Sequence, residues 1–72
     1  MLDTGMTSRD VLRRIRRAGG TPVRLHQVGS HAKYQVGDCR TIIPLHSGDI
    51  PVGTLRAIER DLEPCLGGRW MR

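Results

Sequence analysis

A histidine that follows a tight turn is the residue in this sequence best placed for acid–base chemistry. Gly29 and Ser30 predict the turn, because glycine adopts a positive φ without steric cost, and His31 comes next. The alternation that follows predicts a strand with Ala32, Tyr34 and Val36 on one face and with His31, Lys33 and Gln35 on the other. A free imidazole has a pKa of about 6.5, so it can gain or lose a proton near neutral pH. The alternative is a surface histidine beside a turn, without a role in chemistry.

The other histidines and the aromatic residues are weaker candidates. His26 is expected on the neighbouring strand, as a second acid or base or, as we favour, a surface residue. His46 lies in a predicted loop, where capping the loop is the alternative to a functional role. No spacing supports a zinc site built from the three histidines. Tyr34 could stack on a base, but its predicted face is the one that helices cover, and the sequence does not predict where Trp70 lies.

Length and charge restrict the class of partner. The chain has 72 residues, enough for one domain, and a deep pocket for a large cofactor is not expected at this size. Twelve Lys and Arg against seven Asp and Glu give a net charge of +5. All the basic residues except Lys33 are arginines, whose planar side chains bind phosphate in a bidentate manner. The expected partners are therefore RNA, DNA or an acidic protein.

Targeting signals and paired cysteines are not evident. No apolar run approaches the ~20 residues of a membrane helix, and the N-terminus lacks the basic and apolar regions of a signal peptide. Cys39 and Cys65 are far apart and lack the CxxC spacing of a zinc or redox site. We therefore expect a cytoplasmic protein with two free thiols and no membrane association.

The first element is expected to be a helix over residues 8–18. Thr7 can cap its start with an acidic residue in the first turn, and Gly19 ends it. Apolar residues recur at helical spacing, namely Val11, Leu12, Ile15 and Ala18. The opposite face is rich in arginine, including Arg13 and Arg17. This face either tracks phosphate or is simply solvated, and the solvated interpretation is slightly favoured.

Three strands and a second helix should follow. Short turns separate the expected strands, at residues 23–28, 31–36 and 39–45, which predicts an antiparallel meander. Strict alternation in the first strand places Arg24 on one face with His26 and Val28. In the third strand, Pro44 should end the pairing with its neighbour. The second helix is expected at residues 51–62, with Asp49 as its cap and Glu63-Pro64 as its end.

These elements predict an α+β fold, a two-layer sandwich of helix, three antiparallel strands and helix. Both helices should cover one face of the sheet and leave the face of His31 and Lys33 open. The expected organisation is a flexible leader at residues 1–6, one domain at 7–62 and a C-terminal tail at 63–72.

Three pieces of the chain, in order over residues 7–62, resemble the HicA family of toxins. They are the arginine-bearing helix ending in Ala18-Gly19, the Gly29-Ser30-His31 turn with Tyr34 three residues on, and Ile43-Pro44-Leu45-His46 followed by Ile50 and Gly53-Thr54-Leu55-Arg56-Ala57-Ile58. Members have the fold of double-stranded-RNA-binding domains, cleave mRNA with the histidine of the Gly-Ser-His turn and pair with HicB antitoxins. The resemblance therefore implies a toxin endoribonuclease, His31 as its catalytic residue and a HicB-like antitoxin as partner.

Such a reaction needs few protein groups, because RNA carries its own nucleophile, the 2′-hydroxyl. A histidine acid or base suffices with a cation near the phosphate, and neither a metal nor another cofactor is required. The candidate RNA-binding residues are Gly29, Ser30, Lys33, Arg24, Arg13 and Arg17. Two alternatives remain: a noncatalytic RNA-binding module of the same fold, and an interaction module for an acidic protein.

Overall fold

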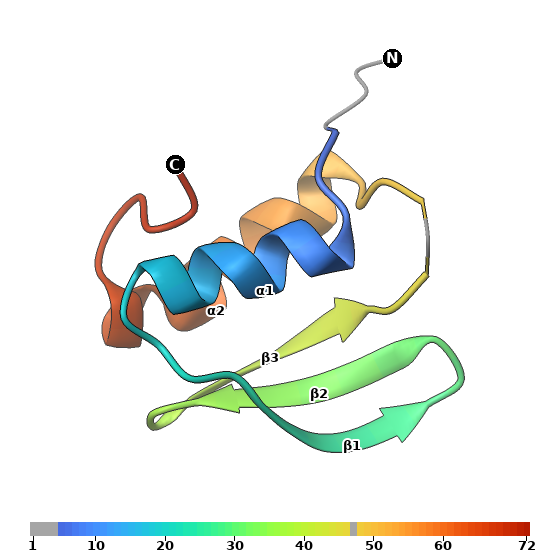
Figure 1. Ribbon diagram of the computed structural model, residues 1–72, viewed down its shortest axis with the longest axis horizontal. Helices are drawn as coiled ribbons and strands as arrows, with labels where there is room; N and C mark the ends of the chain where they lie inside the picture. Colours follow the sequence, from blue (N-terminus) through green and yellow to red (C-terminus); the bar gives the residue numbers. More distant parts are fainter. Residues whose placement is uncertain (1–4, 47) are drawn as a thin grey trace.

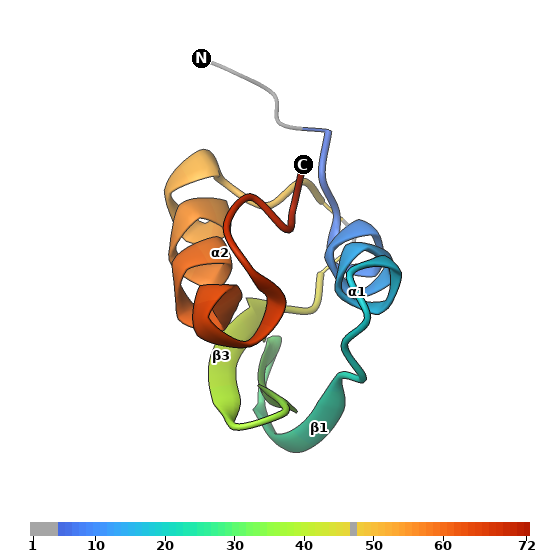
Figure 2. The ribbon, with the colours of Figure 1, turned by 90° about the vertical axis from the view of Figure 1, so that its left-hand side faces the viewer.

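A computed structural model describes residues 5–46 and 48–72 of the chain. The elements follow the order α1 (Ser8–Arg17), β1 (Val23–Val28), β2 (His31–Val36), β3 (Cys39–Pro44) and α2 (Val52–Leu66). The strands form one antiparallel sheet in the order β1-β2-β3, and both helices lie on the same side of it (Figure 1 and Figure 2). The predicted α+β two-layer fold is confirmed. None of the described helices is long and apolar enough to cross a membrane.

A reciprocal cap starts α1, as the sequence predicts. The Thr7 hydroxyl accepts from the backbone N–H of Asp10 at 3.3 Å, and the Asp10 carboxylate accepts from the N–H of Thr7 at 3.0 Å. These bonds satisfy two N–H groups that the first helical turn leaves without a partner. The helix ends where Gly19 takes a φ of +95°, a conformation that glycine adopts easily.

The cap of α1 should make stability depend on acid. Hydrogen bonds from the Thr7 backbone and hydroxyl, helped by the nearby Arg13 and Arg14, lower the pKa of the Asp10 carboxyl. Because this pKa is lower in the folded chain than in the unfolded one, the stabilisation is complete above about pH 4 and disappears as the pH falls through the lowered value. Asp10→Asn should therefore lower the thermal unfolding midpoint at pH 7, and its deficit should shrink below about pH 4. If Asp10→Asn lowered the unfolding midpoint equally at pH 2.5 and pH 7, the ionised Asp10 carboxylate would not be the source of the stabilisation.

A bulge in β1 changes which of its side chains share a face. Arg24 pairs with Tyr34 and His26 pairs with Lys33, so the register shifts at Leu25. Directly opposite residues of an antiparallel pair lie on the same face, so Arg24 lies on the side of the buried Tyr34. The prediction that Arg24 shares a face with His26 and Val28 is therefore wrong, because the extra residue interrupts the alternation.

The core lies between the helices and the covered face of the sheet. All of its members are at most 8% exposed: Val11, Ile15, Ala32, Tyr34, Val36, Ile43, Ile50, Leu55, Ile58, Leu62, Trp70 and Met71. The apolar stripe predicted for the first helix supplies Val11 and Ile15, whereas Leu12 is only partly buried and Ala18 is exposed. The second helix supplies Leu55, Ile58 and Leu62. The covered and open faces of β2 are as predicted, since Ala32, Tyr34 and Val36 are buried.

The second helix differs from its prediction at both ends. Its N-cap residue is Pro51, which makes no side-chain capping hydrogen bond, so the N-cap position expected for Asp49 is wrong. Pro64 lies inside the helix, which continues to Leu66. Near a C-terminus the missing N–H of proline removes a single hydrogen bond, and the last turn is retained because Leu66 packs against the core.

The C-terminal segment returns across both helices (Figure 2). Trp70 is 6% exposed, and its indole N–H donates to the carbonyl of Glu59 at 2.9 Å. Arg14 donates to the carbonyl of Met71, and Arg17 donates to that of Arg72 at 3.3 Å. At the other end of the domain Met6, within the expected leader, is partly buried and its carbonyl accepts from the N–H of Ile50 at 2.7 Å. Met6 and the C-terminal segment thus pack against the domain, whereas residues 1–4 of the expected leader lie outside the described residues.

The two cysteines form a disulfide. Cys39 at the start of β3 is bonded to Cys65 in the last turn of α2, with Cα atoms 6.1 Å apart. The prediction of two free thiols is therefore wrong. Spacing in sequence did not suggest the pair because the fold brings together residues that are 26 positions apart.

Candidate functional site

The turn before His31 is held by hydrogen bonds from residues on both sides of it in the sequence. Gly29 has a φ of +58°, as the first central residue of a two-residue hairpin turn requires. The Gln27 side chain donates to the carbonyl of Gly29 at 2.9 Å, and the N–H of Leu45 donates to that of Ser30. His31 is exposed and begins β2 directly after this turn. The local structure therefore holds an imidazole at the rim of the sheet.

Pairing across the strands shows which residues share the open face with His31. His31 lies between Val28 and Pro44, and the next row along the sheet places Lys33 between His26 and Ile42. A third row places Gln35 between Val23 and Arg40. Neighbouring strands are about 4.8 Å apart, so the side chains of one row are in contact range. His26 and Lys33 are therefore neighbours on the open face, and His31 lies in the row next to them.

The charge of this face is entirely positive. None of the residues of the three strands is an Asp or a Glu. Lys33 and Arg40 are exposed, and neither they nor the His31 side chain forms an ion pair or hydrogen bond with other described residues. A surface with exposed cations and an uncovered imidazole favours phosphate or carboxylate ligands.

The predicted RNA-binding residues divide between two sides of the molecule. Gly29, Ser30 and Lys33 lie with His31 on or beside the open face. Arg24 lies on the opposite face, where its guanidinium donates to the Gln27 side-chain oxygen at 2.7 Å. Arg13 and Arg17 lie in the helical layer, and Arg13 forms an ion pair with Asp10 at 2.6 Å. The tertiary structure does not bring the three arginines to the histidine.

The structure also places the two other histidines. His26, interpreted from sequence as a surface residue, is exposed but lies directly opposite Lys33 on the open face. His46 accepts through Nδ1 from the N–H of Gly48 at 3.2 Å, the loop-capping role that was its alternative. It also lines a hollow of about 310 Å³ with Thr7, Ser8 and Arg9 at the start of α1. No group of three or more His, Cys, Asp or Glu in the described part of the chain could hold a metal ion.

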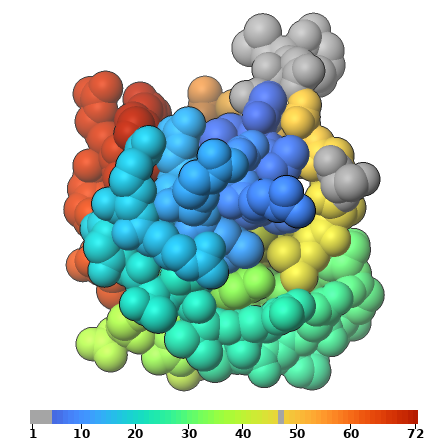
Figure 3. All heavy atoms as spheres, in the orientation of Figure 1, coloured from blue at the N-terminus to red at the C-terminus, as the bar shows by residue number. Residues whose placement is uncertain are grey.

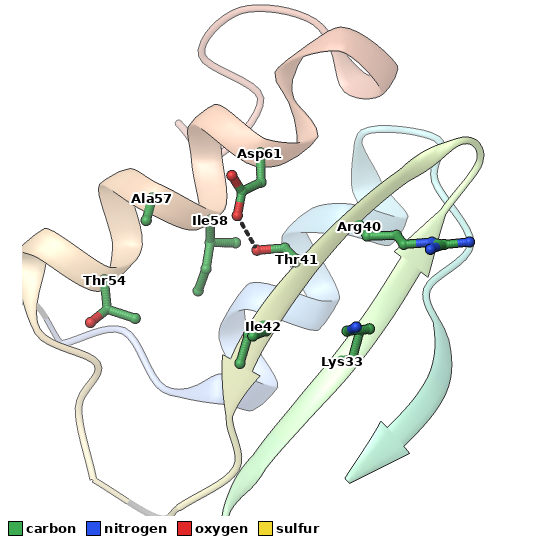
Figure 4. A pocket seen from close by; sticks show the side chains of 8 residues that line it. All are labelled: Lys33, Arg40, Thr41, Ile42, Thr54, Ala57, Ile58 and Asp61. Atoms are coloured by element: carbon green, nitrogen blue, oxygen red, sulfur yellow. Dashed lines mark hydrogen bonds between the residues drawn. The ribbon is translucent and has the colours of Figure 1, made fainter. Parts of the chain in front are cut away.

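A groove separates β3 from α2 beside this face (Figure 4). Its volume is about 340 Å³, and it is lined by Lys33, Arg40, Thr41, Ile42, Thr54, Ala57, Ile58 and Asp61. The Thr41 hydroxyl donates to Asp61 Oδ2 at 2.9 Å and joins the two walls. Sequence reasoning missed Arg40 and Ile42 as part of this surface. The alternation in β3, with Thr41 and Ile43 buried and Arg40 and Ile42 exposed, is the signal that could have found them.

The free edge of β1 is a further exposed feature of the sheet. All six residues of β1 are exposed, including Val23, Leu25 and Val28, and the strand forms the lower rim of the surface (Figure 3). An edge strand that exposes apolar side chains can pair with another chain unless something interrupts it. The bulge at Leu25 is such an interruption.

A family model described as HicA toxin of bacterial toxin-antitoxin matches residues 8–63 of the 72-residue chain. The match spans both helices almost completely, and it includes the whole sheet and the turn before His31. Neither the curated proteins nor the solved structures contain a match to the chain.

Proposed function

The chain belongs to the HicA family of toxins from bacterial toxin–antitoxin systems, and on that premise we propose that it is an endoribonuclease that cleaves mRNA with His31 as acid or base. The observation that supports this proposal most directly is the position of His31. It is an exposed imidazole after a hydrogen-bonded turn, on an open sheet face without acidic residues. Such a face can accept a polyanion without repulsion.

The reaction we propose is attack by the 2′-hydroxyl of RNA on the adjacent phosphate. The bond from the 2′-oxygen to phosphorus forms while the bond to the 5′-oxygen of the next nucleotide breaks. His31 takes the proton from the 2′-hydroxyl or gives a proton to the leaving 5′-oxygen, and water supplies the complementary transfer. Lys33, two residues along the same face, stabilises the charge that develops on the phosphoryl oxygens. No step in this scheme requires a metal.

The other RNA-binding candidates have more general roles in this proposal. The backbone N–H groups at Gly29 and Ser30 are near enough to His31 to contact a phosphate. Arg13, Arg17 and Arg24 lie away from the open face, so we assign them long-range attraction of RNA and no contact at the scissile bond.

We further propose a HicB-like protein as the antitoxin, with both proteins acting in the cytoplasm where mRNA is translated. The net charge of +5 and the uncompensated cations of the open face favour an acidic partner. Association should therefore become slower and weaker as the salt concentration rises. Binding rates measured by surface plasmon resonance at several salt concentrations test this expectation.

Incubation of a long RNA with the purified protein in EDTA tests the proposed activity. We expect fragments to accumulate with the wild-type protein, since the scheme uses only protein groups and the 2′-hydroxyl. A chain that binds this RNA without cleaving it would be a noncatalytic RNA-binding module of the same fold. A chain that binds an acidic protein but no RNA would be an interaction module.

A further inference from the structure

The groove between β3 and α2 has the features of a protein-docking site. β3 is at an edge of the sheet, with no described strand pairing along its outer side, so alternate backbone N–H and C=O groups point away from β2. Ile42 is 52% exposed on one side of the groove, and Ala57 and Ile58 line the other (Figure 4). A groove with apolar walls beside a free strand edge suits an extended segment that adds to the sheet and inserts a side chain.

The charges around the groove select among possible occupants. Lys33 and Arg40 line it and have no side-chain partner among the described residues, whereas Asp61, the acid that lines it, accepts from Thr41. The cations therefore favour carboxylates, and the apolar walls favour an aliphatic or aromatic side chain between them. A nucleotide base fits less well, because Ile42, Ala57 and Ile58 offer no side-chain hydrogen bonds to it.

We propose that an extended segment of the antitoxin docks in this groove, pairs with the free edge of β3 and places an apolar side chain against Ile42 and Ala57, with carboxylates at Lys33 and Arg40. The inference rests on the proposed role of the chain as the toxin of a toxin–antitoxin pair. Lys33 lines the groove and lies one row from His31 on the open face, so a segment in the groove contacts a neighbour of the proposed catalytic residue. The groove would thus anchor the inhibitor without using the imidazole as a contact.

Titration calorimetry of the purified toxin with its purified antitoxin, without RNA, tests the groove. Ile42→Asp and Ala57→Glu introduce negative charge on its two walls and should each weaken binding by about 30-fold or more, as expected for anchor residues. Leu25→Asp is the matched control, because Leu25 is 47% exposed on the other edge strand, and it should change the affinity by less than about threefold. Circular dichroism and unfolding midpoints identify any variant that fails to fold.

Amide hydrogen exchange of the wild-type toxin provides a readout that does not depend on mutation. Complex formation should protect backbone amides of β3 and leave those of β1 unchanged. Protection of β1 instead, or equal loss of affinity in Leu25→Asp, would place the partner at the opposite edge and overturn the proposal. Groove variants that keep antitoxin affinity but lose RNA cleavage would assign the groove to RNA and overturn the proposal. Absence of any binding between the wild-type toxin and the antitoxin would also overturn the proposal. Since the calorimetry and the hydrogen exchange use no RNA, an inactive nuclease would refute the proposed activity and leave this inference standing.

Discussion

Replacement of His31 with alanine should reduce RNA cleavage by at least ~100-fold, the usual contribution of a positioned acid or base. The fold should remain intact, because the side chain is exposed and lies outside the core. RNA affinity should change much less, since cations supply most of the attraction to phosphate. Cleavage rates and binding constants of wild type and His31→Ala, with His31→Gln as a polar replacement, measure the two effects separately.

His26→Ala is the matched control for this experiment. His26 is also an exposed histidine on the open face, but it lies in the next row, opposite Lys33. We expect this variant to retain most of the cleavage activity and the growth arrest caused by expression. Equal cleavage by wild type and His31→Ala would refute the catalytic assignment and favour the RNA-binding module. A large loss in His26→Ala alone would move the assignment to the neighbouring strand.

Reduction of the disulfide should be the largest perturbation of stability that leaves the sequence unchanged. The bond joins residues separated by 26 positions, and closing such a loop in the unfolded chain is worth about 3 kcal/mol on the chain-entropy model. A domain this small has little stability in reserve, so dithiothreitol should lower the unfolding midpoint by roughly 10–20 °C. Thermal unfolding followed by circular dichroism, with and without the reductant, measures the difference.

The double variant Cys39→Ser/Cys65→Ser separates the disulfide from other effects of the reductant. It should unfold near the midpoint of the reduced wild-type protein, and dithiothreitol should not change that midpoint. If the wild-type midpoint were also insensitive to dithiothreitol, the bond would make no contribution to stability under these conditions. The result also bears on localisation, because a protein of the reducing cytoplasm normally keeps its cysteines as thiols.

Local sequence determined most of the elements that position the candidate site. The Thr7–Asp10 cap and the helical spacing of Val11 and Ile15 determine α1 through contacts within a few residues. The Gly29-Ser30 turn and the alternation after it determine that His31 and Lys33 share an exposed face. Each of these features depends on neighbours along the chain, so each could be predicted before the structure was known.

Only the tertiary structure decided the features that depend on distant residues. The bulge at Leu25 sets the register of β1, and it removes Arg24 from the face of His31. Trp70 is buried because the chain returns over the helices and α2 offers the carbonyl of Glu59 to the indole N–H. The Cys39–Cys65 bond and the groove beside Ile42 exist because α2 lies along β3. Packing of one element against another determines these features, and no local pattern of residue types encodes it.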